Sequence, residues 1–166
     1  MADSFVSLEG KVALITGGSR GMGRACALTF ADAGADSLVT SRKQADLDAV
    51  VKEIEAKGRR GLGVVSDVGN MDDCRRLMDT VKAEFGRIDI LVNNAAMVPY
   101  GLPPLIDTDE ELYDQQMNVN LKGPLVLSQL AARMMREQSG GAIISVASTQ
   151  AFVRRTRYTL FLRQLL

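Results

Sequence analysis

Short apolar runs alternate along the chain with longer stretches in which apolar residues recur every third or fourth position. Such runs are typical of strands buried on both faces, and the three-and-four spacing is typical of helices with one buried face. The alternation extends from about residue 11 to about residue 147. The pattern predicts five strands, at Val12–Ile15, Leu38–Thr40, Leu62–Val65, Ile88–Val92 and Ala142–Ala147.

Four amphipathic helices are predicted between these strands, and a glycine follows each of them. Glycine is favoured there because many helices end on a residue in the left-handed conformation. Pro124 lies inside the last and longest helix, and it should kink that helix because it has no backbone N–H to donate. The predicted helices cover residues 22–33, 47–54, 74–85 and 109–137.

Repeated strand–helix units with right-handed crossovers predict an α/β fold with a doubly wound, Rossmann-like parallel sheet. The expected order of the five strands is 3-2-1-4-5. No linker or internal repeat interrupts the pattern, so we expect one domain over residues 1–152. Residues 153–166 differ in character, because they contain four arginines and no acidic residue, and we interpret them as a divergent basic tail.

Composition excludes several classes of function. The 20 basic and 20 acidic residues balance, so neither nucleic acid nor a membrane is an expected partner. The chain has no histidine, which excludes Ser-His-Asp catalysis and nearly all catalytic zinc sites. Cys26 and Cys74 are expected to be packed free thiols rather than a disulfide or a metal site. A cytoplasmic protein without a metal is therefore expected.

A glycine-rich segment, Thr16 to Gly23, joins the first predicted strand to the first predicted helix. Glycine lets a backbone turn tightly and approach a pyrophosphate, and the N-terminus of the following helix attracts the anion. This context, a strand before the glycines and a helix after them, predicts a dinucleotide site. The candidate binding residues in the segment are Gly17, Ser19, Arg20, Gly21, Met22 and Gly23.

Further polar motifs follow the later strands, whose carboxyl ends should meet at the edge of the sheet where ligands bind. Asp67-Val68 follows the third strand, and residues 93–96, with the sequence Asn-Asn-Ala-Ala, follow the fourth. Residues 118–123 lie within the long helix, and Ser148 comes at the end of the fifth strand.

Together these motifs resemble the short-chain dehydrogenase/reductase family of single-domain NAD(P)-dependent oxidoreductases, over residues 8–152. The resemblance implies that three of the glycines form the dinucleotide loop and that Asp67 binds the adenine amine beside the Val68 backbone. It further implies that Asn94 and Ala95 line the adenosine ribose pocket and that Asn93 ties the fourth strand to its neighbour. Ala96 stands where the family usually has glycine.

The residues after the second strand bear on the choice of cofactor. An NAD site needs a carboxylate there to bind the ribose 2′-hydroxyl, but residues 40–43 read Thr-Ser-Arg-Lys. A 2′-phosphate is bound by cations and small donors, which Ser41, Arg42 and Arg20 supply. We therefore expect NADP in preference to NAD. The alternative, that Arg42 and Lys43 merely begin a solvated helix, explains the charges but not the missing acid.

The family resemblance also implies the catalytic residues. Ser148 matches the serine that hydrogen-bonds the substrate carbonyl, and Asn120 matches the asparagine that holds a water in the proton relay. The alternative for Asn120 is a structural one, a polar helix residue bonding at the Pro124 kink. The implied reaction is hydride transfer in carbonyl reduction or alcohol oxidation of a small molecule.

The match fails where the family has a tyrosine with a lysine four residues later, because those positions hold Phe161 and Leu165. Tyr158 lies one turn too early, and no lysine follows Lys122. The family's last two strands are also missing, so the fifth strand should lie at an exposed apolar edge. We interpret the chain as a truncated or frame-shifted oxidoreductase.

Two functions follow from these observations. The first is an NADP-dependent oxidoreductase of this family whose turnover is impaired. The alternative is a non-catalytic nucleotide-binding domain or partner subunit. Family members commonly associate through the long helix, so a homo-oligomer formed through residues 109–137 is a further expectation.

Overall fold

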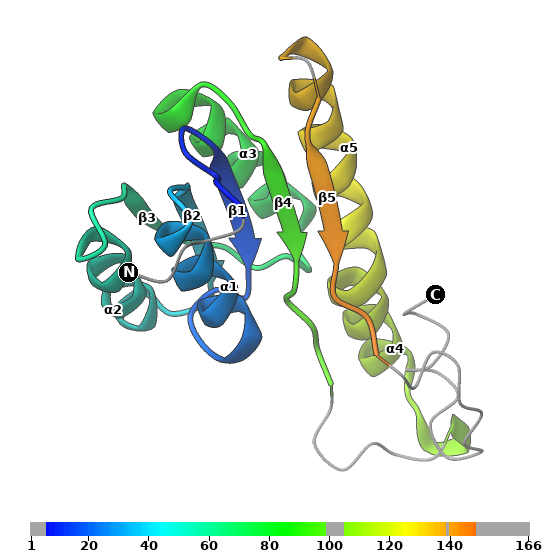
Figure 1. The fold of residues 1–166 in the computed structure, drawn as a ribbon. Helices are drawn as coiled ribbons and strands as arrows, with labels where there is room; N and C mark the ends of the chain where they lie inside the picture. The colour runs from blue at the N-terminus through cyan, green and yellow to red at the C-terminus, as the bar shows by residue number, and fades with distance from the viewer. Residues whose placement is uncertain (1–5, 99–104, 139, 149–166) are drawn as a thin grey trace.

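The computed structural model describes residues 6–98, 105–138 and 140–148 of the 166-residue chain. Within them one parallel sheet has the strand order β3-β2-β1-β4-β5, which confirms the predicted fold class and order (Figure 1). The strands are β1 (Val12–Thr16), β2 (Asp36–Ser41), β3 (Gly61–Val65), β4 (Ile90–Asn93) and β5 (Ala142–Ser145).

The predicted fourth and fifth strands each extend two residues too far. The fourth strand begins at Ile90 rather than Ile88, because the backbone of Ile88 bonds to a side chain: its N–H donates to Gln138 Oε1 and its carbonyl accepts from Gln138 Nε2. The fifth strand ends at Ser145 rather than Ala147, although the Val146 N–H still donates to the Asn93 carbonyl.

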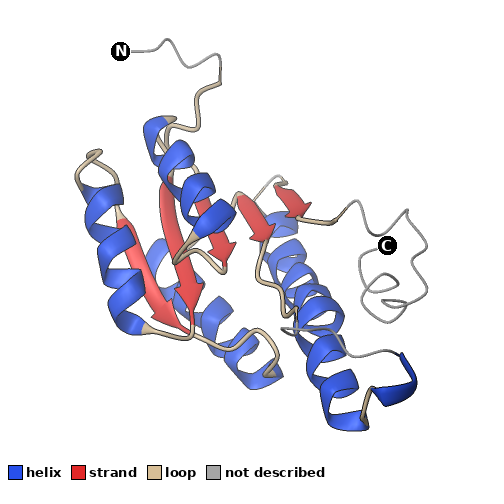
Figure 2. Cartoon of the chain, turned by 90° about the horizontal axis from the view of Figure 1, so that it is seen from below, coloured by secondary structure: helices blue, strands red, loops and turns tan. Residues whose placement is uncertain are grey.

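Helices cover both faces of the sheet (Figure 2). Alternate strand residues point to opposite faces, so Leu14 packs toward α3 and α5 while Ala13 and Ile15 pack toward α1 and α2. This two-sided burial explains why β1 and β2 read as nearly continuous apolar runs. The helices are α1 (Gly21–Asp32), α2 (Gln44–Glu55), α3 (Met71–Phe85), α4 (Glu110–Met117) and α5 (Gly123–Glu137), with a short 3-10 helix η1 (Leu105–Asp107) before α4.

The long predicted helix is interrupted earlier than expected. A π-helical turn, η2 (Asn118–Lys122), joins α4 to α5, and the Gly123 N–H donates to the Asn118 carbonyl. Pro124 lies in the first turn of α5 rather than at a mid-helix kink. The wider turn lets the helix continue past a residue that cannot donate a backbone hydrogen bond.

Strand β5 lies at the edge of the sheet, as expected, and all four of its residues are exposed. Ile143 and Ile144 are 41% and 44% exposed, whereas Leu91, paired with Ile143 on β4, is fully buried. An apolar edge strand of this kind favours pairing with another chain.

A buried carboxylate, Asp89, anchors β1 to β4 at the opposite end of the sheet from the glycine segment. It accepts the Val12 N–H at 3.0 Å and two bonds from the Arg87 guanidinium at 2.7 and 2.8 Å, and it pairs with Lys11 at 3.4 Å. Burial alone would raise the pKa of Asp89, but the Arg87 and Val12 hydrogen bonds and the two neighbouring cations together hold this pKa below its ordinary value.

Candidate functional site

The glycine segment forms a tight loop between β1 and α1, and each of its three motif glycines is required for a different reason. Gly17 has a φ of +65°, and a Cβ there would lie 2.9 Å from Asn94 Nδ2. Gly23 lets α1 approach the loop, because its Cβ would lie 2.3 Å from the Gly17 carbonyl oxygen. Gly21 has a φ of +56° but faces open space, with no heavy atom within 4 Å of its would-be Cβ. Gly17 and Gly23 therefore allow the close packing of the loop, and Gly21 leaves open space beside the loop.

Asn94 holds this loop closed from the end of β4. Its Nδ2 donates to the carbonyls of Thr16 at 2.9 Å and Gly17 at 3.2 Å. Its expected role in lining a ribose pocket stays a prediction, because the contacts that the structure shows are to the glycine loop.

Thr16, which the sequence analysis did not single out, joins the same two segments from the other side. Its hydroxyl accepts the N–H groups of Asn94 and Ala95, each at 3.0 Å, and donates to the Val92 carbonyl at 3.3 Å. The only signal in the sequence was its position at the start of the glycine motif. The loops after β1 and β4 therefore form one hydrogen-bonded unit.

The N-terminus of α1 is suited to an anion. Arg20 precedes the helix without a side-chain hydrogen bond to the first turn, and that turn carries no acidic residue. In contrast, Asn70 caps α3, Asp109 caps α4, and both helices have two acids in the first turn. The exposed first-turn N–H groups and the positive end of the α1 dipole therefore favour an anionic ligand.

Two arginines flank this helix end. Thr16 and Thr40 are in register on β1 and β2, so the glycine loop and the Ser41–Arg42 turn leave the sheet side by side. Ser41 bonds locally to the Lys43 backbone at 3.4 Å. Arg20 and Arg42 are both exposed, and neither forms an ion pair with any residue that the structure describes. Their charges are therefore available to a ligand at this edge.

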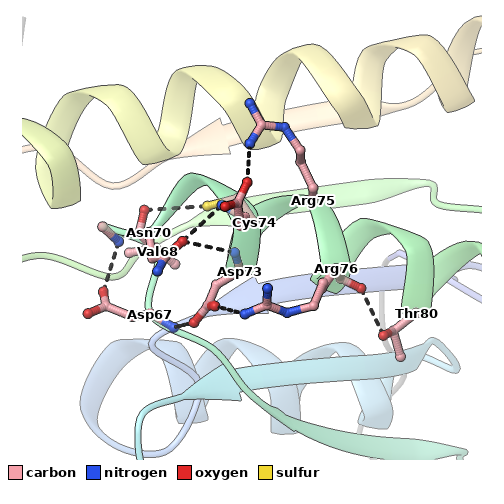
Figure 3. Close-up of polar contacts among 10 residues, drawn as sticks. Asp67, Val68, Asn70, Asp73, Cys74, Arg75, Arg76 and Thr80 are labelled. Carbon is pink, nitrogen blue, oxygen red and sulfur yellow. Dashed lines mark hydrogen bonds and ion pairs between the residues drawn. The ribbon is translucent and has the colours of Figure 1, made fainter.

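The turn after β3 brings Asp67 and Val68 to the same edge of the sheet (Figure 3). Asp67 is exposed, and its Oδ1 accepts the Gly69 N–H at 2.8 Å. Its own N–H donates to Asp73 Oδ2 at 2.8 Å, which links the turn to the first turn of α3. Val68 is buried, and its carbonyl accepts a bond from Cys74 Sγ at 3.4 Å.

The thiol of Cys74 serves packing rather than chemistry. Burial, with smaller contributions from the charges of Asp73 and Asp67, raises the pKa of Cys74 to about 11. The group is therefore protonated at neutral pH and donates to Val68 instead of acting as a nucleophile. Cys26, like Cys74, is a free thiol.

Asn120 lies in the π-helical turn, where it clamps the segment that follows β4. Its Oδ1 accepts the Met97 N–H at 2.8 Å, and its Nδ2 donates to the Met97 carbonyl at 2.9 Å. These contacts give the side chain a structural role, but they are made to Met97 and not at the Pro124 kink that the alternative interpretation named. The predicted role in a proton relay remains a prediction.

The π-helical turn also supports the turn after β3. A Cβ on Gly123 would lie 2.1 Å from the Val68 carbonyl oxygen, and one on Gly69 would lie 2.8 Å from a methyl group of Val119. The backbones of the two turns are thus in direct contact.

Ser148 is half-buried and lies three residues beyond Ser145, the last residue of β5, which is in register with Asn93 at the end of β4. The neighbouring Asn93 differs in part from its implied role, because its side chain donates to Ser128 Oγ of α5 at 3.0 Å, while its backbone alone bonds the next strand. The other positions on which the catalytic argument depends, Tyr158, Phe161 and Leu165, lie outside the described residues, as does the predicted boundary at residue 152.

Two further observations concern the described residues alone. They contain no group of three or more histidine, cysteine or acidic side chains that could hold a metal ion. None of their helices combines the length and the apolar character that crossing a membrane requires.

Known proteins carry the same fold and sequence pattern. The pattern of the short chain dehydrogenase family matches residues 11–161, so the chain belongs to this family. An uncharacterised oxidoreductase of Thermotoga maritima is 36% identical over 158 residues, which are 93% of this chain and 61% of that protein. The chain therefore spans about three fifths of the length of this relative.

Two solved structures are also similar. A short chain dehydrogenase from Burkholderia cenocepacia, solved in complex with NADP, has a TM-score of 0.87 and 38% identity, covering 95% of this chain and 64% of that one. A metagenomic short-chain oxidoreductase, also solved with NADP, has a TM-score of 0.90 and 32% identity, covering 95% and 71% of the two chains.

Proposed function

We propose that this chain binds NADP(H) at the carboxyl edge of its sheet and derives from an oxidoreductase that acts on a small carbonyl or alcohol. The observation that carries the proposal is the closed loop of Gly17, Gly23 and Asn94 beside the uncapped start of α1. A close backbone turn with free N–H groups suits a pyrophosphate. When bound, the nicotinamide supplies a hydride donor or acceptor.

The chain's own residues fit the parts of such a cofactor. The first turn of α1 would hold the pyrophosphate, and the open space beside Gly21 leaves room for it. Asp67, whose Oδ2 bonds to none of the described residues, would accept a bond from the adenine amine beside the Val68 backbone. Ala95 follows Asn94 at the end of β4 and would lie against the adenosine ribose.

Charge favours NADP over NAD. Arg20 and Arg42 are exposed, without ion-pair partners among the described residues, and residues 40–43 at the end of β2 include no carboxylate to bind a ribose 2′-hydroxyl. The planar guanidinium groups match a 2′-phosphate. The NADP in the complexes of the Burkholderia and metagenomic proteins is consistent with this preference.

We expect the catalytic rate of this chain to be low, because only part of the family's catalytic set is present in its sequence. Ser148 would hydrogen-bond the substrate carbonyl, and Asn120 would fix the segment after β4 through Met97. Phe161 and Leu165 can supply neither a proton donor nor an ammonium group. Loss of a positioned acid–base group costs about 10²–10⁴ in rate, so we expect little or no turnover.

An alternative is a non-catalytic nucleotide-binding subunit. It is favoured by exposed apolar side chains on the continuous helical segment formed by α4, η2 and α5. In this segment Tyr113, Leu121 and Leu125 are 43%, 45% and 55% exposed. Such exposed apolar side chains suit a homo-oligomer or a full-length relative as partner.

The cytoplasmic location expected from composition also remains a prediction.

Two parallel assays on the purified 166-residue chain test the proposal. NADPH oxidation over a panel of ketones and quinones should show no carbonyl-dependent rate above background. Titrations that follow reduced-nicotinamide fluorescence should show saturable binding of NADPH and at least tenfold weaker binding of NADH. Ordinary turnover would contradict the impairment, and equal affinities would contradict the NADP preference.

A further inference from the structure

The first two turns of α3 contain two acid–arginine pairs that have the same spacing but different contacts. Asp72 pairs with Arg75, and Asp73 pairs with Arg76, each three residues apart. The Asp73–Arg76 pair is labelled in Figure 3. Both side chains of the first pair are exposed to solvent. In the second, Asp73 is largely covered, with 20% of its side chain exposed, and its other oxygen accepts the Asp67 N–H at 2.8 Å.

This contact fixes the residue that faces the ligand edge. The backbone of Asp67 is held at its N–H by Asp73, and its carbonyl accepts the Asn70 N–H at 2.9 Å. Its carboxylate is held at Oδ1 by the Gly69 N–H at 2.8 Å, and Oδ2 bonds to none of the described residues. The direction of that oxygen therefore depends on these bonds, including the one that the Asp67 N–H donates to Asp73.

Arg76 makes this arrangement electrostatically possible. Asp67 and Asp73 place two carboxylates next to one another, and the Arg76 guanidinium bonds the Asp73 carboxylate on the side away from the turn. Without the cation, like-charge repulsion would push Asp73 away from the turn that it holds.

We propose that Asp73, held by Arg76, is a positioning residue that aims the Asp67 carboxylate at a 6-amino group and so selects adenine over a 6-oxo purine. This inference rests on the proposed binding of NADP(H). A carboxylate accepts a bond from an amino group but is repelled by a carbonyl oxygen at the same place. The selectivity arises only while the carboxylate is held in one direction.

The test compares NADPH with reduced nicotinamide hypoxanthine dinucleotide phosphate, which carries a carbonyl in place of the adenine amine. A hydrogen bond to a charged group corresponds to a preference of about tenfold to a hundredfold for NADPH in the native chain. Asp73→Ala should reduce the ratio of the two dissociation constants to about threefold or less, and Arg76→Ala should give an intermediate ratio. Asp73→Asn keeps an acceptor for the Asp67 N–H and should retain most of the preference.

Matched controls come from the neighbouring pair. Asp72→Ala removes the same charge from the same helix turn, and Arg75→Ala removes its partner, but these two side chains bond each other and not the backbone of Asp67. Both variants should keep the native ratio. Because the ratio is taken within one protein, a loss of folded material in Asp73→Ala lowers both affinities equally and cancels.

Each outcome decides a separate point. A native ratio in Asp73→Ala, with NADPH still bound, would overturn the positioning role and leave the proposed function standing. An equal fall in the Asp72→Ala control would also overturn it, because general loss of charge would then explain the effect. Binding of neither dinucleotide by the native chain would overturn the proposed function and this inference together.

Discussion

Replacing Gly23 by alanine tests the packing that closes the proposed cofactor loop. The added methyl carbon would lie 2.3 Å from the Gly17 carbonyl oxygen and 2.5 Å from Asn94 Nδ2, both closer than real Cβ atoms approach such groups. Either α1 must move away from the loop, or Asn94 must give up its bonds to the Thr16 and Gly17 carbonyls.

The expected change in stability follows from two opposing contributions. Overpacking of this kind costs about 1–3 kcal/mol, and replacing a helical glycine by alanine returns about 1 kcal/mol. The net loss in the free energy of unfolding should therefore be about 0–2 kcal/mol, which corresponds to a fall of up to roughly 8 °C in Tm for a domain of this size. Displacement of the loop should weaken NADPH binding at least tenfold, which corresponds to about 1.4 kcal/mol.

Gly21→Ala is the matched control, because its methyl group meets no atom within 4 Å. Alanine at this position must adopt the left-handed conformation, at φ +56°, which destabilises the folded state. Alanine also lowers the entropy of the unfolded chain, so the net loss in the free energy of unfolding should be about 1 kcal/mol or less. Its methyl group would instead enter the space proposed for the pyrophosphate. The loss in the free energy of NADPH binding should therefore exceed the loss in the free energy of unfolding. Thermal unfolding followed by circular dichroism and NADPH titration measure both effects. Native Tm and native affinity in Gly23→Ala would refute the reasoning.

Three further predictions concern other parts of the molecule. Arg42→Ala should weaken NADPH binding about tenfold and leave NADH binding unchanged in fluorescence titrations, because only the 2′-phosphate needs the guanidinium; equal losses for both would count against the assignment. Gly123→Ala should lower Tm by several degrees in thermal unfolding, because its methyl group would lie 2.1 Å from the Val68 carbonyl oxygen; an unchanged Tm would contradict that contact. Because Arg87 and other donors lower the pKa of Asp89, its stabilising effect is complete above the ordinary carboxylate pKa of about 4 and is lost as pH falls through the lowered native value. Asp89→Asn should therefore be less stable than the native chain in urea unfolding at pH 7, and the difference should narrow below about pH 4; a constant difference would contradict this linkage.

The strands and their order could be predicted because each strand is indicated by residues that are close together in the sequence. Apolar runs bounded by turns indicated each strand, and the alternation of strands and helices left few topologies open. The boundary at Ile88 could not be predicted, since its backbone is bound by Gln138, which is 50 residues away in the sequence.

The site was predictable at the level of motifs but not of contacts. The glycine spacing indicated the loop, yet nothing local showed that Thr16 and Asn94, 78 residues apart, would hold it closed. The link from Asp73 to Asp67 was missed for a different reason. An acid in the first turn of a helix is common, and its spacing does not reveal which backbone N–H it binds.

We expect the purified chain to bind NADP(H) at the glycine loop and to catalyse little or no carbonyl reduction beside it. Titration of NADPH into the purified 166-residue chain, followed by the fluorescence of the reduced nicotinamide, tests this most directly. We expect a saturable signal that NADP displaces, with an NADPH affinity at least tenfold weaker in Gly23→Ala. A folded chain that gives no saturable signal would contradict it.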